Sequence, residues 1–276
     1  MNNLRRELAP ISTAAWDEID DEARRVLRLK LAGRKLVDFE GPLGSAAAAI
    51  TLGRTERLRS GPVPEVSGVR RLSQPLVEMT TTFELSRAEL DAVEHGAADP
   101  DLAPLIAAAT RMAQAEDTAI FHGYAEGNIQ GIDKASPHSA LTIAENYETY
   151  PRTVAEAARL LRISGIDGPY GIALGPRCYT GVMQATAQGG YPILELIRKT
   201  IDGPVVWAPA VDGAVVLSVR GGDFQLTVGR DLSIGYLSHT DSTVRLYFVE
   251  TMTFRALMPE AAVALKYANT KAAKRR

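Results

Sequence analysis

The segment 41–75 constrains the fold most, because it is long and yet offers little apolar surface to bury. Helix- and strand-breaking residues recur through it, namely Gly41, Pro42, Gly44, Gly53, Gly61, Pro62, Pro64, Gly68 and Pro75. Short β-compatible pieces, 46–52 and 69–72, lie between these residues. Such a stretch cannot bury itself well. The segment is therefore either a mobile loop or an arm whose missing contacts come from another chain.

The segment 12–33 is predicted to be one amphipathic helix that begins at Ser12 and ends at Gly33. Its apolar residues recur at spacings of three and four and so share one face. They are Trp16, Ile19, Ala23, Val26, Leu27 and Leu31. Acidic residues crowd the first half of the segment and basic residues the second, an order that complements the helix dipole.

Strands and helices mix through the rest of the chain, which predicts an α+β fold. Further helices are expected at 86–96, 101–121, 153–163, 176–183 and 192–200. Ser86 and Glu89 form one capping box, and Thr153 and Glu156 form a second. Strands are expected at 76–83, 170–174, 205–207, 214–220, 224–228, 232–237 and 244–257. The last is unusually long, which indicates a bent strand along a spine between two regions.

The composition is that of a folded protein, and it argues against nucleic acid and membranes as partners. Of 276 residues, 46% are hydrophobic, and the formal net charge is −2, so nothing global attracts nucleic acid or an anionic membrane. The N-terminal residues lack the apolar run of a secretion signal, and a lone cysteine fits a reducing compartment. A soluble intracellular protein is expected, with a solvated basic tail at its C-terminal end.

No residue pattern points to catalysis or to a metal site. The four histidines, His95, His122, His138 and His239, are scattered and lack metal-ligand spacing. Cys178 lies near a predicted helix N-terminus, where a nucleophilic thiolate is conceivable, but a small buried thiol is the commoner case. The adjacent Glu116 and Asp117 are expected on a solvated or interface-paired face. The sequence 221–223 is expected to form a hairpin turn.

Several short stretches follow one another in a specific order between residue 3 and about residue 265. They are 3–11 (NLRRELAPI), 16–20 (WDEID), 31–42 (LAGRKLVDFEGP), 116–123 (EDTAIFHG), 167–170 (DGPY), 220–224 (RGGDF), 231–236 (DLSIGY) and 244–251 (VRLYFVET). The ordered set resembles the encapsulin family, also described as linocin-type bacteriocins. The resemblance covers nearly the whole chain.

This resemblance implies a tailed-phage major-capsid-like fold. Its parts would be an N-terminal arm and interior helix (1–40), an extended loop (41–75), a peripheral domain (76–128 and 223–265), an axial domain (129–222) and a basic tail (266–276). The extended loop would lie on a neighbouring subunit, which favours the arm over the mobile loop.

The implied function is that of a shell subunit and not an enzyme. Family members form closed icosahedral shells, and this compact chain resembles the smallest, of about 60 copies. Each shell is a cytoplasmic nanocompartment around a cargo enzyme that carries a C-terminal targeting peptide. The usual cargo is a ferritin-like protein or a dye-decolorising peroxidase, which implies iron storage or oxidative-stress defence. The alternatives are a phage major capsid protein and a hydrolase that depends on Cys178.

The resemblance also assigns candidate sites. The cargo peptide would bind Leu27, Leu31, Arg34, Asp38, Asp231, Leu232 and Ile234. A pore loop at the five-fold axis would comprise Gln184, Ala185, Thr186, Ala187, Gln188, Gly189 and Gly190, followed by Tyr191. This loop is uncharged, so a neutral pore without a ring of metal ligands is expected. No cofactor is expected in the shell, because Arg87 takes the position where some members place a flavin-binding tryptophan.

Overall fold

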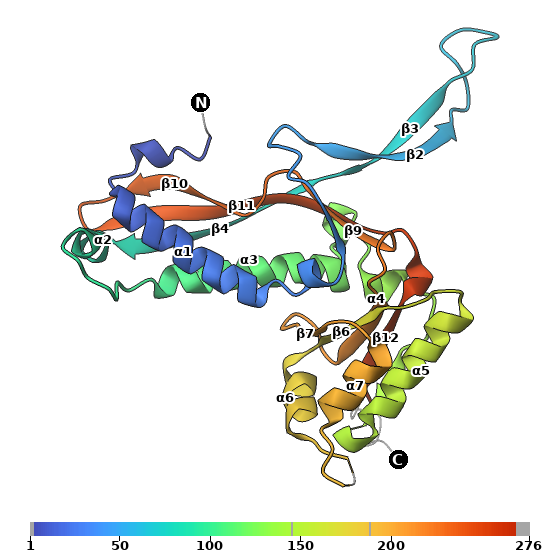
Figure 1. Ribbon diagram of the computed structural model, residues 1–276. Helices are drawn as coiled ribbons and strands as arrows, with labels where there is room; N and C mark the ends of the chain where they lie inside the picture. Colours follow the sequence, from blue (N-terminus) through green and yellow to red (C-terminus); the bar gives the residue numbers. More distant parts are fainter. Residues whose placement is uncertain (1–2, 145, 188, 269–276) are drawn as a thin grey trace, which may run out of the picture.

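The computed structural model describes residues 3–144, 146–187 and 189–268, which form two bodies and a projecting arm (Figure 1). The first body contains α1 (Thr13–Lys30), α2 (Arg87–Glu94), α3 (Ala103–Phe121) and one sheet. Its strands are β1 (Asp38–Glu40), β9 (Phe224–Val228), β11 (Thr243–Ala256), β10 (Ser233–His239) and β4 (Val77–Ser86).

The second body packs helices around a separate sheet. Its strands, in spatial order, are β5 (Leu141–Ile143), β12 (Ala262–Tyr267), β8 (Ala214–Ser218), β6 (Tyr170–Leu174) and β7 (Val205–Trp207). Its helices are α4 (Ile132–Ala135), α5 (Tyr150–Ile163), α6 (Pro176–Gln184) and α7 (Ile193–Ile201). All residues of β6 and β8 are buried, as expected for central strands. No helix in the described ranges has the length and apolar character needed to cross a bilayer.

Strand β11 organises the first body, which confirms the long strand expected near the C-terminal end. One edge of β11 pairs antiparallel with β4, from Thr243 with Ser86 to Met252 with Val77. Its other edge pairs first with β10 and then with β9. A single strand thereby joins β9 and β10, which directly precede it, to β4, which is distant in the sequence.

Helix α1 forms as expected, because Ser12 caps its N-terminus. The Ser12 hydroxyl accepts a hydrogen bond from the amide of Ala15 at 3.1 Å. The buried face of α1 packs against α3, which in turn lies along β4. The C-terminal half of α1 is thereby fixed beside the first sheet.

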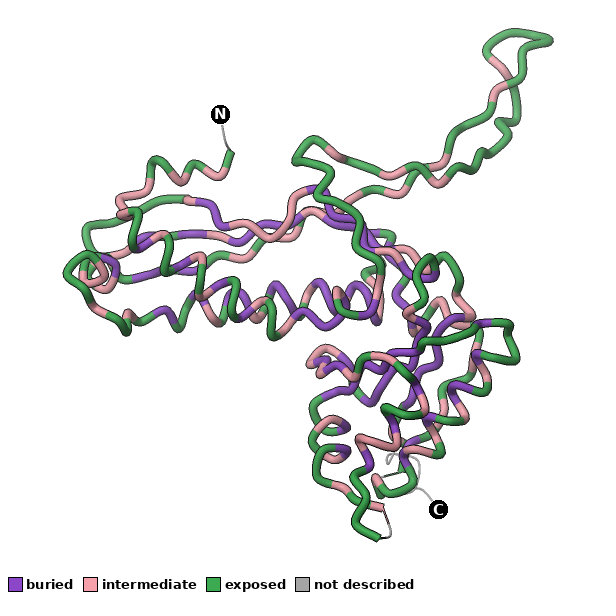
Figure 2. Tube along the Cα trace, in the orientation of Figure 1, coloured by how far each residue is buried: buried purple, intermediate pink, exposed green. Residues whose placement is uncertain are grey.

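The arm is an ordered hairpin of β2 (Ala49–Arg57) and β3 (Val69–Pro75) that projects from the first body (Figure 1). Every residue from 41 to 75 is exposed or half-buried (Figure 2). Large apolar side chains near its tip are among the exposed ones, including Leu58, Val63 and Val66. A two-stranded hairpin is only marginally stable alone in water. The arm shape agrees with the expectation of an element that needs contacts from outside the subunit.

Both predicted capping boxes are wrong in their hydrogen bonds. Helix α2 does follow Ser86, but the Ser86 side chain makes no capping bond. Glu89 instead accepts a hydrogen bond from the amide of Asp101 at 2.9 Å, which ties α2 to the start of α3. Thr153 lies inside α5, because that helix already begins at Tyr150 with a proline in its first turn.

Two further expectations about chain connections differ from the structure. The sequence 221–223 is not a hairpin turn, because β8 before it and β9 after it belong to different sheets. It is a crossover between the two bodies. The peripheral domain implied by the resemblance runs to residue 265, whereas Ala262–Tyr267 forms β12, which pairs with β8 and β5 in the second sheet.

Candidate functional site

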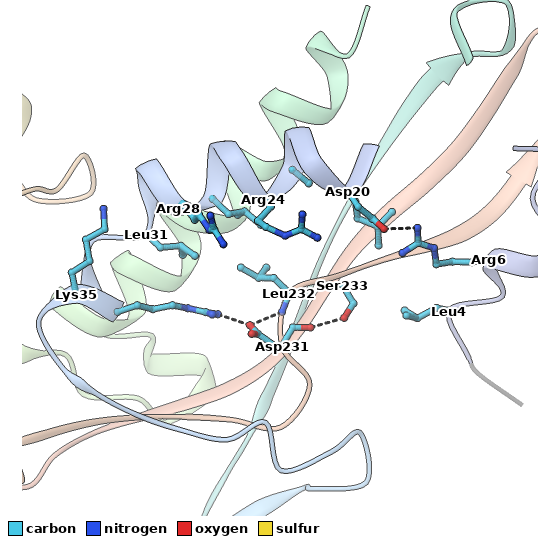
Figure 3. A pocket seen from close by; sticks show the side chains of 14 residues that line it. Leu4, Arg6, Asp20, Arg24, Arg28, Leu31, Lys35, Asp231, Leu232 and Ser233 are labelled. Atoms are coloured by element: carbon cyan, nitrogen blue, oxygen red, sulfur yellow. Dashed lines mark hydrogen bonds and ion pairs between the residues drawn. The ribbon is translucent and has the colours of Figure 1, made fainter. Parts of the chain in front are cut away.

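A groove of about 610 Å³ opens between α1, the N-terminal segment and the start of β10 (Figure 3). Three parts of the chain that are distant in sequence form its walls. Its lining residues are Leu4, Arg6, Asp20, Ala23, Arg24, Leu27, Arg28, Leu31, Arg34, Lys35, Asp231, Leu232, Ser233 and Ile234.

Six of the seven residues predicted to bind cargo line this groove. They are Leu27, Leu31, Arg34, Asp231, Leu232 and Ile234. Asp38 does not line it. The Asp38 carboxylate accepts a hydrogen bond from the amide of Gly222 at 2.5 Å, at the crossover between the two bodies. Asp38 therefore has a structural partner outside the groove.

Sequence reasoning missed two groups of lining residues. Asp20, Ala23, Arg24 and Arg28 lie three or four positions from one another or from Leu27 and Leu31 on the same side of α1, so helical spacing could have found them. Leu4 and Arg6 belong to the N-terminal segment and have no such local signal. They reach the groove because the carbonyl of Leu4 accepts a hydrogen bond from the amide of Tyr236 at 2.8 Å.

The groove combines an apolar floor with a charged rim. Ala23, Leu31 and Ile234 are buried beneath it, and Leu27 and Leu232 are half-buried beside them. Asp20 on the rim forms an ion pair of 2.8 Å with Arg6. A site of this kind suits an extended segment with apolar side chains and a few polar groups.

Arg34 closes one end of the groove by binding three carboxylates. Its Nη2 atom lies 2.6 Å from Glu116, 2.7 Å from Glu250 and 2.8 Å from Asp231. Glu116 and Glu250 are fully buried, on α3 and β11 respectively. One guanidinium thus joins the turn that follows α1 to α3, to β11 and to the loop before β10.

The expectation of a solvated or interface-paired face for Glu116 and Asp117 is wrong. Both side chains are buried within the subunit. The two oxygens of Asp117 accept hydrogen bonds from the amides of Ala32 and Gly33, at 3.0 and 2.8 Å. Gly33 allows this close approach, because a Cβ atom there would lie 2.5 Å from the side chain of Ile120, which would have to shift. The pair anchors the turn that follows α1.

Burial shifts the pKa values of the ionisable groups around Arg34. Burial raises the pKa of Asp117 to about 7, although its two backbone hydrogen bonds act in the opposite direction. Burial and the adjacent Glu116 raise the pKa of Glu250 well above its usual range. Burial lowers the pKa of Arg34, but Glu116, Asp231 and Glu250 outweigh it and raise the value overall, so Arg34 stays charged.

The predicted pore loop lies apart from the groove, between α6 and α7 of the second body. The amide of Ala187 donates to the carbonyl of Tyr191 at 2.8 Å, which closes the loop upon itself. Gln188 falls outside the described residues. A cation that the sequence reasoning did not consider lies nearby, since the Lys199 ammonium is 5.0 Å from the centre of the Tyr191 ring.

Cys178 is a buried free thiol, as the sequence favoured. Its sulfur lies 2.9 Å from the phenol oxygen of Tyr267, which in turn lies 2.8 Å from that of Tyr147. Arg87 begins α2, and its guanidinium Nη1 lies 3.4 Å from the carbonyl of Thr240. Within the described ranges, no group of three or more His, Cys, Asp or Glu side chains is placed to hold a metal ion.

Solved structures identify the fold as that of a capsid subunit. The virus-like particle from Pyrococcus furiosus matches with a TM-score of 0.66 at 15% identity, covering 91% of this chain and 99% of that one. The capsid of Myoviridae phage XM1 matches with a TM-score of 0.53 at 8% identity, covering 86% and 90%. The predicted tailed-phage major-capsid-like fold is therefore confirmed.

Sequence comparison then gives the family. Residues 1–253 match the family described as "encapsulating protein for peroxidase". The type 1 encapsulin shell protein of Rhodospirillum rubrum is 50% identical, covering 96% of this chain and 97% of the relative. That of Mycobacterium tuberculosis is 45% identical, covering 97% and 100%. The chain belongs to the encapsulin shell protein family, which confirms the resemblance.

Proposed function

We propose that this chain is the shell-forming subunit of a closed icosahedral nanocompartment in the cytoplasm, and that its groove holds the C-terminal targeting peptide of a cargo enzyme. In this role the chain is structural and performs no catalysis itself. The observation that carries the proposal is the gathering of six predicted cargo-binding residues around one groove. The names of the relatives, which are shell proteins, support the same role.

Self-assembly would use the arm and the two bodies. The arm carries Arg54, Arg57, Arg59, Arg70 and Arg71 together with exposed apolar side chains, which suits contacts with neighbouring copies. The first body would be the peripheral domain, and the second would be the axial domain around the symmetry axes. A compact chain of this length favours the smallest closed shell, of about 60 copies.

The cargo would determine the physiological role. The family description names a peroxidase as what its members encapsulate. We propose a dye-decolorising peroxidase or a ferritin-like protein as cargo, with roles in oxidative-stress defence or iron storage. The loop 184–190 would line a pore at the five-fold axis through which small substrates reach the enclosed enzyme. Its uncharged side chains favour a pore with little charge selectivity.

Co-expression with a peptide-tagged cargo tests this function. The chain would be produced with a dye-decolorising peroxidase that ends in a targeting peptide, and particles would be isolated by size exclusion and viewed by negative-stain microscopy. We expect closed particles that carry peroxidase activity. The variant Leu232→Asp places a charge on the apolar groove and should give particles without cargo.

Leu237→Asp is the matched control, because Leu237 lies on β10 shortly after Leu232, is exposed and does not line the groove. This variant should assemble and load as the unmodified chain does. Recovery of the unmodified chain only at monomer mass would refute the shell proposal. Equal loading of both variants would refute the assignment of the groove to cargo.

A further inference from the structure

The two acidic side chains that line the groove are already paired within the subunit. Asp20 binds Arg6, whose guanidinium also lies 3.9 Å from the centre of the Trp16 ring. Asp231 binds Arg34 at 2.8 Å. Each acid therefore already has a cationic partner within the subunit, although Asp231 shares Arg34 with Glu116 and Glu250.

Besides Arg6 and Arg34, three basic side chains line the groove, and they differ in their partners. Arg24 forms an ion pair with Asp21 on the exposed surface of α1. The ammonium of Lys35 donates to the carbonyl of Leu29 at 3.3 Å. For Arg28, no ion pair or hydrogen bond of its side chain to another described residue is present. Arg28 is exposed and lines the groove.

The position of Arg28 favours an external anion. Figure 3 shows Arg24 and Arg28 extending from α1 into the space above Leu232. The two residues are four positions apart on one helix, where like charges repel each other. Arg28 also lies in the last turn of α1, where a cation complements the helix dipole. An interaction with the helix dipole alone would not require the Arg28 side chain to point in any particular direction. The side chain nevertheless lines the groove.

We propose that the groove selects peptides that carry a carboxylate beside their apolar side chains, and that Arg28 binds this carboxylate. The inference rests on the proposed function of the groove and adds the charge of the partner. The occupant is an extended segment with apolar residues on the floor formed by Leu31 and Ile234, and an anionic group at the rim. The carboxylate is either an Asp or Glu side chain or the C-terminal end of the cargo.

A selection experiment in whole particles tests the charge preference. The chain would be co-expressed with a fluorescent carrier protein that bears a library of short random C-terminal peptides. Carriers that copurify inside particles would be identified by mass spectrometry. Peptides retained by the unmodified chain should be enriched in Leu, Ile and Val and also in Asp and Glu. In Arg28→Glu the apolar enrichment should remain and the acidic enrichment should disappear.

Three further arms make the result decisive. Arg28→Gln removes the charge with little change in size, and it should lower loading of an acidic carrier by roughly three- to tenfold. Arg25→Gln is the matched control, because Arg25 lies on the same helix, binds Glu22 and does not line the groove. It should load normally. A second library, in which a Gly-Ser tail follows the random segment, separates an acidic side chain from the terminal carboxylate.

The possible outcomes distinguish a failure of the Arg28 assignment from a failure of the proposed cargo function. Apolar enrichment without acidic preference, or an acidic preference that persists in both Arg28 variants, would overturn the role of Arg28 and leave the groove as a cargo site. Recovery of carriers with no enrichment of any residue type would overturn the cargo function itself. Acidic enrichment in the first library alone would assign the carboxylate to the C-terminal end.

Discussion

Arg34 shows how one residue can connect most of the first body. Its guanidinium is mostly shielded, with a side-chain exposure of 18%, and it contacts carboxylates on α3, on β11 and on the loop before β10. Buried charges of this kind are costly to leave unpaired. Arg34 was predicted as a ligand-binding residue, yet its contacts within the subunit give it a second, structural role.

Replacing Arg34 by Ala should destabilise the subunit by about 3–5 kcal/mol, because Glu116 would remain buried without its cation. Chemical denaturation followed by circular dichroism would measure the free energy of unfolding. Arg25→Ala provides the comparison, since its pair with Glu22 is largely exposed on the arginine side, and a change within about 0.5 kcal/mol is expected. Equal stability of the two variants would contradict a structural role for Arg34.

The buried Asp117 predicts a pH dependence of stability. Its pKa is raised from 3.8 to about 7, so the folded state favours the protonated carboxyl. This contribution to stability is complete below the unfolded value and is lost as the pH rises through about 7. The free energy of unfolding should therefore fall between pH 4 and pH 7, and Asp117→Asn should flatten that slope. An unchanged slope in the variant would assign the dependence to other groups.

Sequence reasoning reached some of these residues and not others, for a physical reason. The period of the helix 12–33 placed Leu27 and Leu31 on one face, and the resemblance added the β10 side of the groove. The partners of Arg34 could not be found locally, because Glu116 and Glu250 lie 82 and 216 positions away. Only the packing of α3 and β11 brings them together, and that packing also buries two acids expected to be solvated or at an interface.

At the scale of elements, the arm carries the clearest consequence. Strands β2 and β3 pair with each other and form a sheet of their own. The arm is tied to the body near its base, where the Gln74 amide donates to Thr253 and to the carbonyl of Phe254, both at 2.9 Å. The part beyond this base is available for contacts with other copies.

Removing residues 54–71 and closing the strands with an Asn-Gly turn should leave a folded subunit that no longer forms closed particles. The deletion takes away exposed surface and leaves the two cores intact. Size exclusion with light scattering would measure the mass, and circular dichroism would verify the fold. Particles of the original mass would show that the arm is dispensable for assembly.

The element scale also shows which patterns were reliable. Long periodic segments such as α1, α3 and β11 were predicted within a few residues, because each buries one regular face. The first capping box failed because Glu89 accepts a hydrogen bond from the amide of Asp101 at the start of α3, and the second failed because α5 already begins at Tyr150. Strand β12 was not predicted, and the domain boundary at residue 265 cuts through it, because its partners β5 and β8 are distant in the sequence.

At the scale of the whole molecule, His122 joins the two bodies. It follows the last residue of α3, and its Nδ1 lies 3.0 Å from Asp133 on α4. Its Nε2 lies 2.9 Å from the carbonyl of Ala210, in the loop between β7 and β8. Both partners are acceptors, so the doubly protonated ring satisfies both contacts.

The geometry at His122 predicts a pH-sensitive connection between the bodies. The hydrogen bond to Asp133 raises the pKa of His122 above 6.5, although burial and Lys266 oppose this. The stabilisation is complete below pH 6.5 and is lost as the pH rises through the raised value. We expect His122→Phe to lower stability by about 1–2 kcal/mol at mildly acidic pH and by less at pH 9. Thermal unfolding across this range would measure the difference, and an equal loss at both pH values would contradict it.

The pairing of β11 also sets the order in which the chain can fold during synthesis. In the sheet, Ser86 pairs with Thr243 and Val77 pairs with Met252. Strand β4 is therefore synthesised long before its partner β11. Contacts this distant in sequence form slowly and late. Both sheets close only when translation is nearly complete, because β11 ends at Ala256 and β12 of the second sheet ends at Tyr267. A nascent chain therefore carries its arm before the sheet from which the arm projects can form.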